Sequence, residues 1–170
     1  MIKSMKFIAL LLMISTGCGV YSFTGTTITA ESISISTFFN DTSNGPANIA
    51  VTFTDQLRDY FQQNTSLSQV DSDGELQMEG SIASYRLTPV APSAAESDQS
   101  RDVANLTRLT ITIKVEYVNL ENEDFNFNKS FSQFADFSSE VGLAAVESSL
   151  IDEIFEQIIL DIFNASVANW

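Results

Sequence analysis

The sequence predicts an α+β fold, a two-layer sandwich in which two helices pack on one face of a roughly four-stranded mixed or antiparallel sheet. Apolar residues recur at every second position in several segments, as in half-buried strands, and at helical spacing in two others. The chain has 170 residues, of which 44% are hydrophobic, and its 13 phenylalanines supply material for one core. Each helix has one apolar stripe to bury, so both should cover the same face in the order β-α-β-β-β-α.

The first strand and the first helix are expected on either side of a turn. A period of two runs from Ile33 to Phe39, and the turn-forming cluster 40–45 follows it. Pro46 suits the first position of a helix. Residues 46–63 should form an amphipathic helix, whose apolar positions are Ile49, Phe53, Leu57, Tyr60 and Phe61.

The middle of the chain is expected to form two strands joined by a long loop. Val70 belongs to a short extended piece that leads into a turn. Alternation from Leu76 to Leu87 changes parity, which predicts a β-bulge near Ala83 or Ser84. Residues 88–105 contain two prolines, and loops of this length are usually functional or disordered. The next strand is the most regular, and it turns one set of residues to the core and another to an open face: Leu109, Ile111, Ile113, Val115 and Tyr117 inward, and Arg108, Thr110, Thr112 and Lys114 outward.

A phenylalanine-rich strand and a long helix complete the fold. The strand is expected to have a parity slip, since its phenylalanines do not keep one period: Phe125, Phe127, Phe131, Phe134 and Phe137. Residues 140–165 carry a wide apolar face opposite acidic side chains, which predicts a helix. Ser138 or Ser139 is expected as its N-cap.

The N-terminus carries the pattern of a targeting segment. Lys3 and Lys6 precede the apolar run FIALLLMI, which is too short to span a membrane as a helix. The following Ser-Thr-Gly-Cys resembles the lipobox of bacterial lipoproteins, in which the cysteine is lipidated and becomes the first mature residue. We therefore expect a signal peptide over residues 1–17, lipidation at Cys18, a tether over 18–29 and a single domain over 30–170. The alternative is an ordinary secretory signal with a chance cysteine.

Charge and sorting signals predict how the mature chain is held. The formal net charge is −14, so anionic lipid head groups repel the surface and acyl chains must supply the membrane affinity. Gly19 stands where lipoproteins kept at the inner membrane often carry Asp, and no acidic run follows Cys18. These features favour an outer-membrane lipoprotein that faces the periplasm.

The residue composition argues against an enzyme and against a nucleic-acid binder. The chain has no histidine, no Gly-x-Ser-x-Gly elbow and no glycine-rich phosphate loop. It has 8 basic against 22 acidic residues, whereas nucleic acid requires a basic surface. Residues 71–74 (DSDG) match the start of a calcium loop but lack its later acidic positions, so a plain turn is favoured. We expect no catalytic residue, no metal and no cofactor other than the lipid on Cys18.

The scarce basic residues indicate one candidate binding site. Arg86 and Arg101 lie at the two ends of the proline-containing loop, and Arg108 follows at the start of the next strand. Such a patch would suit a phosphate or a carboxylate. The alternative is ordinary charge balance against neighbouring acidic residues.

Five segments in order resemble the lipopolysaccharide-assembly lipoprotein family LptE, in particular its Bacteroidota members. They cover essentially the whole mature chain: residues 18–23 (CGVYSF), 38–41 (FFND), 57–61 (LRDYF), 76–80 (LQMEG) and the closing helix ending in 167–170 (VANW).

This resemblance implies a two-helix, four-strand sandwich that sits as a plug inside the β-barrel translocon LptD and helps insert lipopolysaccharide in the outer leaflet. It also implies lipopolysaccharide contact through basic residues at one end of the sheet, for which Arg86, Arg101 and Arg108 are the candidates. The polar lumen of such barrels suits a surface rich in Ser, Thr and Asn. Two alternatives stay open: a lipid or glycan carrier without a barrel partner, and an envelope adaptor that activates a peptidoglycan enzyme and so has a soluble partner.

Overall fold

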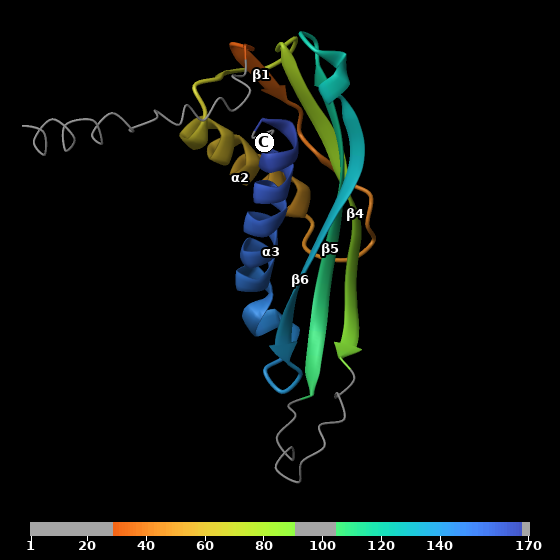
Figure 1. Cartoon of the computed structure of the whole chain (residues 1–170). Helices are drawn as coiled ribbons and strands as arrows, with labels where there is room; N and C mark the ends of the chain where they lie inside the picture. The colour runs from red at the N-terminus through yellow and green to blue at the C-terminus, as the bar shows by residue number, and fades with distance from the viewer. Residues whose placement is uncertain (1–28, 91–104, 168–170) are drawn as a thin grey trace, which may run out of the picture.

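The computed structural model describes residues 29–90 and 105–167, and their arrangement is the predicted α+β sandwich (Figure 1). Cys18, Arg101, the expected signal peptide (1–17) and all of the expected tether (18–29) except residue 29 lie outside the described residues. The helices and strands follow in this order: β1 (Ser32–Ile35), β2 (Phe39–Asn40), α2 (Ile49–Asn64), β3 (Ser68–Val70), β4 (Leu76–Val90), β5 (Leu106–Asn119), the 3₁₀ helix η2 (Glu123–Phe125), β6 (Phe127–Ser138) and α3 (Leu143–Ser166).

The sheet is mixed, with the strand order β3-β1-β4-β5-β6. β1 runs parallel to β3 and β4, β2 pairs in parallel with β4, and β4, β5 and β6 are antiparallel. Six described strands replace the four expected. The predicted first strand is divided into β1 and β2, and the extended piece at Val70 is paired as β3. These pieces have two to four residues, too few for a period of two to be distinctive.

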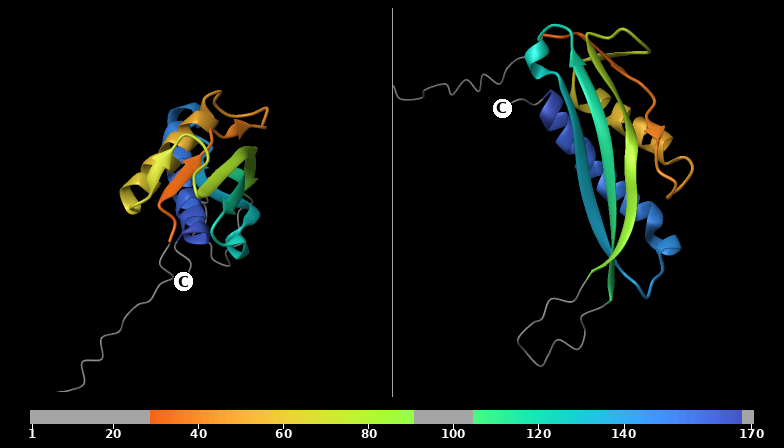
Figure 2. Two further views of the ribbon diagram at one scale, coloured as in Figure 1. Left: turned by 90° about the horizontal axis from the view of Figure 1, so that it is seen from above. Right: turned by 90° about the vertical axis from the view of Figure 1, so that its right-hand side faces the viewer.

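Both helices lie on one face of the sheet, as expected, and the right-hand view of Figure 2 shows the other face in front of them. The predicted inward residues of β5 are all buried, from Leu109 to Tyr117. They pack against residues of the helices with no exposure, among them Phe53, Leu57, Ile154, Phe155 and Ile158. Phe53 joins both helices through an edge contact with Phe155, at 5.0 Å between ring centres. The space between the layers is therefore filled by side chains.

The bulge predicted in β4 is confirmed, because the register with β5 shifts between Ile82 and Ser84. The parity slip predicted for β6 is wrong, since its register with β5 has no shift. Phe134 breaks the phenylalanine period because it lies on the open face, where it is 46% exposed. β6 thus carries aromatic residues on both faces. A prediction that places every phenylalanine on the buried face therefore could not fit this strand.

The helix starts also differ from the expected ones. Pro46 forms a turn before α2, in which its carbonyl accepts a hydrogen bond from the Ile49 N–H, so α2 begins at Ile49. Ser138 is still in β6, and α3 begins at Leu143 after Gly142, whose φ of 73° lies in the left-handed region open to glycine. The predicted serine N-cap is therefore wrong. No helix in the described ranges has the length and apolarity to cross a bilayer.

The two ends of the sandwich are distinct. The described chain starts beside the β5–β6 turn, where the Thr29 hydroxyl hydrogen-bonds to Glu121, and α3 finishes at this end (Figure 1). β4 finishes and β5 begins at the opposite end. Eleven residue steps of β5 separate Arg108 from Asn119, or about 37 Å at strand rise. Arg86 and Arg108 are therefore far from the end at which the chain enters the domain.

Candidate functional site on the open sheet face

Strand register brings two of the three candidate arginines together. Arg108 lies opposite Thr88 of β4, and Arg86 lies opposite Thr110 of β5. Since directly opposed residues of an antiparallel pair point to the same face, Arg86 and Arg108 are diagonal neighbours on the open face. Lys114 shares that face but lies six residues further along β5. The expected cluster is thus a pair of arginines within the described residues.

Arg108 has two partners on the same face. Its Nε and Nη2 donate to the two carboxylate oxygens of Asp136 at 2.7 and 2.8 Å. Its guanidinium carbon lies 3.6 Å from the centre of the Phe134 ring, within the range of a cation–π contact. The hydrogen bonds that Arg108 donates to Asp136 raise the pKa of Arg108 and lower the pKa of Asp136. Asp136 therefore already compensates the charge of Arg108, as the alternative of ordinary charge balance expects.

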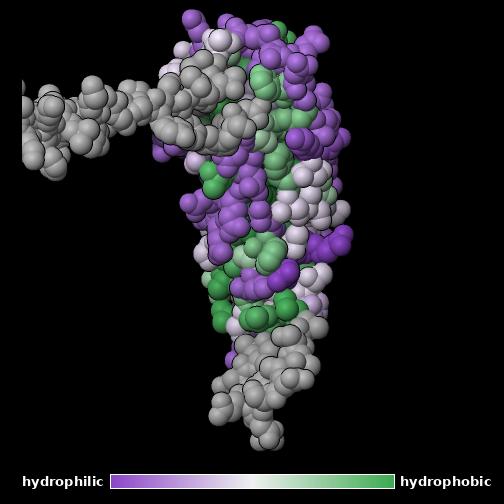
Figure 3. Space-filling view, viewed as in Figure 1, coloured by the Kyte–Doolittle hydropathy of each residue, from purple (hydrophilic) through white to green (hydrophobic). Residues whose placement is uncertain are grey.

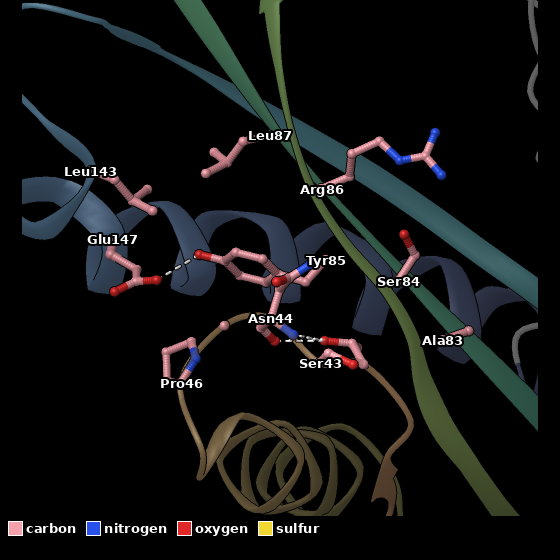
Figure 4. A pocket seen from close by; sticks show the side chains of 12 residues that line it. Ser43, Asn44, Pro46, Ala83, Ser84, Tyr85, Arg86, Leu87, Leu143 and Glu147 are labelled. Carbon is pink, nitrogen blue, oxygen red and sulfur yellow. Dashed lines mark hydrogen bonds between the residues drawn. The ribbon is translucent and has the colours of Figure 1, made fainter.

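Arg86 is exposed and points away from the helix layer (Figure 4). Its neighbour Tyr85 points the opposite way, because successive residues of a strand alternate between faces. An anion that reached this region would therefore meet Arg86 on the open face. To engage Arg108 fully, the anion would have to displace Asp136.

Much of the rest of the open face is polar. The hydroxyls of Thr112 and Ser132 are hydrogen-bonded at 2.9 Å across β5 and β6, and Asn128 donates to Glu116 at 3.1 Å. Phe39 and Phe134 are the large exceptions, at 70% and 46% exposure. The hydroxyl pair and the bond between Asn128 and Glu116 place polar groups on this face that suit contact with another polar surface.

A surface pocket of about 840 Å³ lies at the edge of β4, beside the start of α3 (Figure 4). Tyr85 forms its wall and donates its phenolic hydrogen to Glu147 at 2.7 Å. Burial, and then this bond, raise the pKa of Tyr85. Sequence reasoning missed the pair because the two residues are 62 positions apart on different elements, with no local pattern to link them. The hydrogen bond between Tyr85 and Glu147 links β4 to α3, so we interpret the pair as a structural contact and not as an acid–base dyad.

Residues that could hold a metal are not assembled in the described ranges, where no group of three or more His, Cys, Asp or Glu converges. Residues 71–74 form a turn in which Asp73 has a φ of 58°. Asp tolerates this left-handed backbone conformation better than most residues, which accounts for an Asp at position 73.

Comparisons with known proteins agree with this architecture. A family model described as "LptE: Lipopolysaccharide-assembly" matches residues 30–166. A minor lipoprotein from Acinetobacter baumannii superimposes with a TM-score of 0.54 at 12% identity, over 84% of this chain and 96% of that one. The hypothetical protein CT253 from Chlamydia trachomatis gives 0.53 at 8% identity, over 82% and 99%. At such identities the two structures establish a shared fold. No curated protein matches the chain.

Proposed function

Because the chain belongs to the LptE family of lipopolysaccharide-assembly proteins, we propose that it is the outer-membrane lipoprotein that plugs and helps assemble an LptD-type β-barrel. The observation that carries this proposal is the family match, which spans almost the whole described domain. The family consists of lipoproteins, and the lipobox pattern that ends at Cys18 is consistent with this. The family is not enzymatic, in keeping with a chain without histidine.

The mechanism that we propose is occupancy of the barrel lumen. A plug must be rigid, and the filled core between sheet and helices makes this domain so. It must also face a polar wall, and the hydroxyl-rich open sheet face offers paired polar groups to one. A domain that binds the assembled barrel better than unassembled forms shifts the population toward the assembled one.

The anchor and the arginines would then work at opposite ends of the domain. Acyl chains on Cys18 would hold residue 29, and with it the β5–β6 turn, within reach of the membrane and raise the local concentration of the plug at the barrel. Arg108 lies at the other end, about 37 Å along β5, and Arg86 is its diagonal neighbour on β4. We propose that they contact lipopolysaccharide phosphate there together with Arg101, which belongs to the connection between β4 and β5.

The filled interior also separates the plug from one of its alternatives. A lipid carrier without a barrel partner needs an apolar cavity that takes an acyl chain. Residues that would line such a cavity between the layers, such as Ile113, Val115 and Ile158, have no exposed surface. The packing therefore favours the plug over the carrier.

Co-purification tests the proposal. The full chain, extracted from envelopes in mild detergent, should bring down a β-barrel protein much larger than itself. A Cys18→Ala variant is the control for the anchor, and we expect it to leave the membrane fraction. If the wild-type chain comes free of any large barrel, the plug role is wrong, and a soluble enzyme in its place would support the adaptor alternative.

A further inference from the structure

The outer edge of β6 carries a row of backbone groups that no described strand pairs. β6 ends the strand order and pairs only with β5 on its inner side. Just beyond β6, the Ser139 N–H donates to the Asn105 carbonyl at 2.7 Å, so odd-numbered residues point toward β5. Because the register has no shift, even-numbered residues point outward. The Ser138 carbonyl confirms this parity, since it accepts from Val141 in the following turn. The outward residues are Asn128, Ser130, Ser132, Phe134 and Asp136.

The other exposed edge in this part of the sheet is blunted. In β4 the same alternation turns the backbone groups of Tyr85, Leu87 and Pro89 outward, and Pro89 has no N–H to offer. The bulge after Ile82 interrupts this edge, and the loop at Gly45 packs against the Tyr85 ring. Proline, a bulge and a covering loop are the usual devices against unwanted strand pairing.

β6 has almost none of these devices. Its 12 residues contain no proline and no bulge. Lys129 is an exposed charge near its start, and it lies 5.2 Å from the Phe127 ring. Asp136 is neutralised by Arg108. From Ser130 to Asp136 the edge is therefore regular, uncharged in sum and ready to pair.

We propose that this edge, from Ser130 to Asp136, binds an extended segment of the barrel partner as an added strand. The inference rests on the proposed function. A row of alternating N–H and C=O groups is complemented by another extended backbone, and strand addition is a common mode of recognition. A closed barrel has no free strand edges of its own. The segment must therefore be a loop or a tail of the partner.

The side chains beside the edge define the chemistry of that segment. On the helix side, the partly buried Phe131 and Phe137 and the buried Ala135 are apolar, and Gln133 between them already donates its amide to Asp161 at 2.7 Å, so the segment should present apolar residues to this side. On the open side, Ser130 and Ser132 are small and exposed and suit polar residues, and Phe134 after them is 46% exposed. The segment should thus alternate apolar and polar residues.

A second copy of this chain is a poorer occupant. Two β6 strands that pair antiparallel about a twofold axis would place both α3 helices on the same side of the joined sheet. α3 carries five acidic residues and no basic one, and Figure 3 shows hydrophilic residues over the middle of its outer side. The whole chain has a formal net charge of −14. Like charges oppose such a dimer.

Proline substitution at the edge tests the inference. Ser130→Pro deletes one outward N–H while leaving the inward hydrogen bonds to β5. Leu87→Pro makes the same change on the blunted β4 edge, and Ser130→Ala keeps the N–H. We expect Ser130→Pro to reduce the barrel recovered in detergent at least tenfold, with both controls near wild type and similar thermal unfolding. Equal recovery with Ser130→Pro, or equal loss with Leu87→Pro, would overturn it.

Hydrogen–deuterium exchange on the wild-type chain tests strand addition at β6 even if Ser130→Pro does not fold. In the barrel complex, the amides of Ser130, Ser132 and Phe134 should exchange at least tenfold more slowly than in the chain released from it. Unchanged exchange in the complex would overturn strand addition and leave the proposed function standing. A wild-type chain that recovers no barrel at all would instead remove the proposed function, and this inference with it.

Discussion

Arg108 holds Asp136 across the open face through two hydrogen bonds, from Nε at 2.7 Å and from Nη2 at 2.8 Å. Two-pronged arginine–carboxylate pairs of this kind are geometrically specific. The pair fixes the position of one of the few cations of an acidic chain, and it makes phosphate binding at Arg108 a competition with Asp136.

Asp136→Asn should weaken the fold only where Asp136 is ionised. Arg108 lowers the pKa of Asp136 below 3.8, so the pair contributes stability above the unfolded pKa and loses it as the pH falls through the lowered folded pKa. The difference in unfolding free energy between wild type and variant should be constant from about pH 7 to about pH 5 and shrink in more acidic buffer. Urea titrations across this range measure it, and a difference that persists unchanged into acid would contradict the pairing.

Lipopolysaccharide binding should depend on charge at the far end of the sheet. Arg86→Glu alone, and Arg101→Glu with Arg108→Glu, should each weaken binding to purified lipopolysaccharide. Thermal stability should stay nearly intact in Arg86→Glu, whose side chain is exposed, whereas Arg108→Glu also breaks the pair with Asp136 and should lower stability modestly.

The matched control for Arg86→Glu is Lys114→Glu, which makes the same charge change on the same face, six residues along β5 from Arg108. It should leave binding near wild type. Equal weakening by Lys114→Glu would show that binding follows net charge and not this site. Unchanged binding in the arginine variants would exclude the three arginines as contacts.

Tyr85→Phe should destabilise the contact between β4 and α3. It removes the phenolic donor to Glu147, a hydrogen bond to a charged group, and we expect a loss of about 1–3 kcal/mol in the free energy of unfolding. Burial raises the pKa of Tyr85, so its stabilising effect is present below pH 10.0 and is lost as the pH rises further.

The wild-type advantage over Tyr85→Phe should therefore decline in alkaline buffer, and denaturant unfolding at two pH values measures this decline. Glu147→Gln is the control, because it keeps an acceptor oxygen and should cost less. An advantage that grows with alkaline pH would contradict the assignment.

Gly80→Ala should be among the most damaging small substitutions in the sheet. A Cβ at this position would lie 2.1 Å from the Lys114 carbonyl oxygen and 2.6 Å from a ring carbon of Phe38. Backbone cannot yield cheaply, so we expect a loss of about 3 kcal/mol or more. Gly142→Ala is the comparison, with open space around it and only its φ of 73° to strain, at a cost of about 1 kcal/mol. Thermal melts that rank the two variants in the opposite order would contradict the packing.

Sequence reasoning succeeded wherever periodicity was long. The alternation from Leu109 to Tyr117 predicted β5 and both of its faces, and the parity change near Ala83 located the bulge. Helical spacing identified both helices, although each starts about three residues later than expected. In a long segment the spacing of apolar residues shows both the type of element and the face that it buries, and this spacing can be read from the segment alone.

The errors arose where distant residues decide the structure. The spacing of phenylalanines in β6 predicted a parity slip because Phe134 lies on the open face. There it packs against the guanidinium of Arg108, a contact that the sequence of β6 alone does not indicate. β3 forms because β1 offers it an edge, and its three residues carry no signal alone. The compensation of Arg108 by Asp136 depends on a register between strands 28 residues apart.

The mass of the particle that contains this chain tests the central claim most directly. Native mass spectrometry of the wild-type protein, extracted in mild detergent, should give the sum of one acylated chain and one large β-barrel. A mass equal to that of the chain alone, with or without its lipid, would contradict the account.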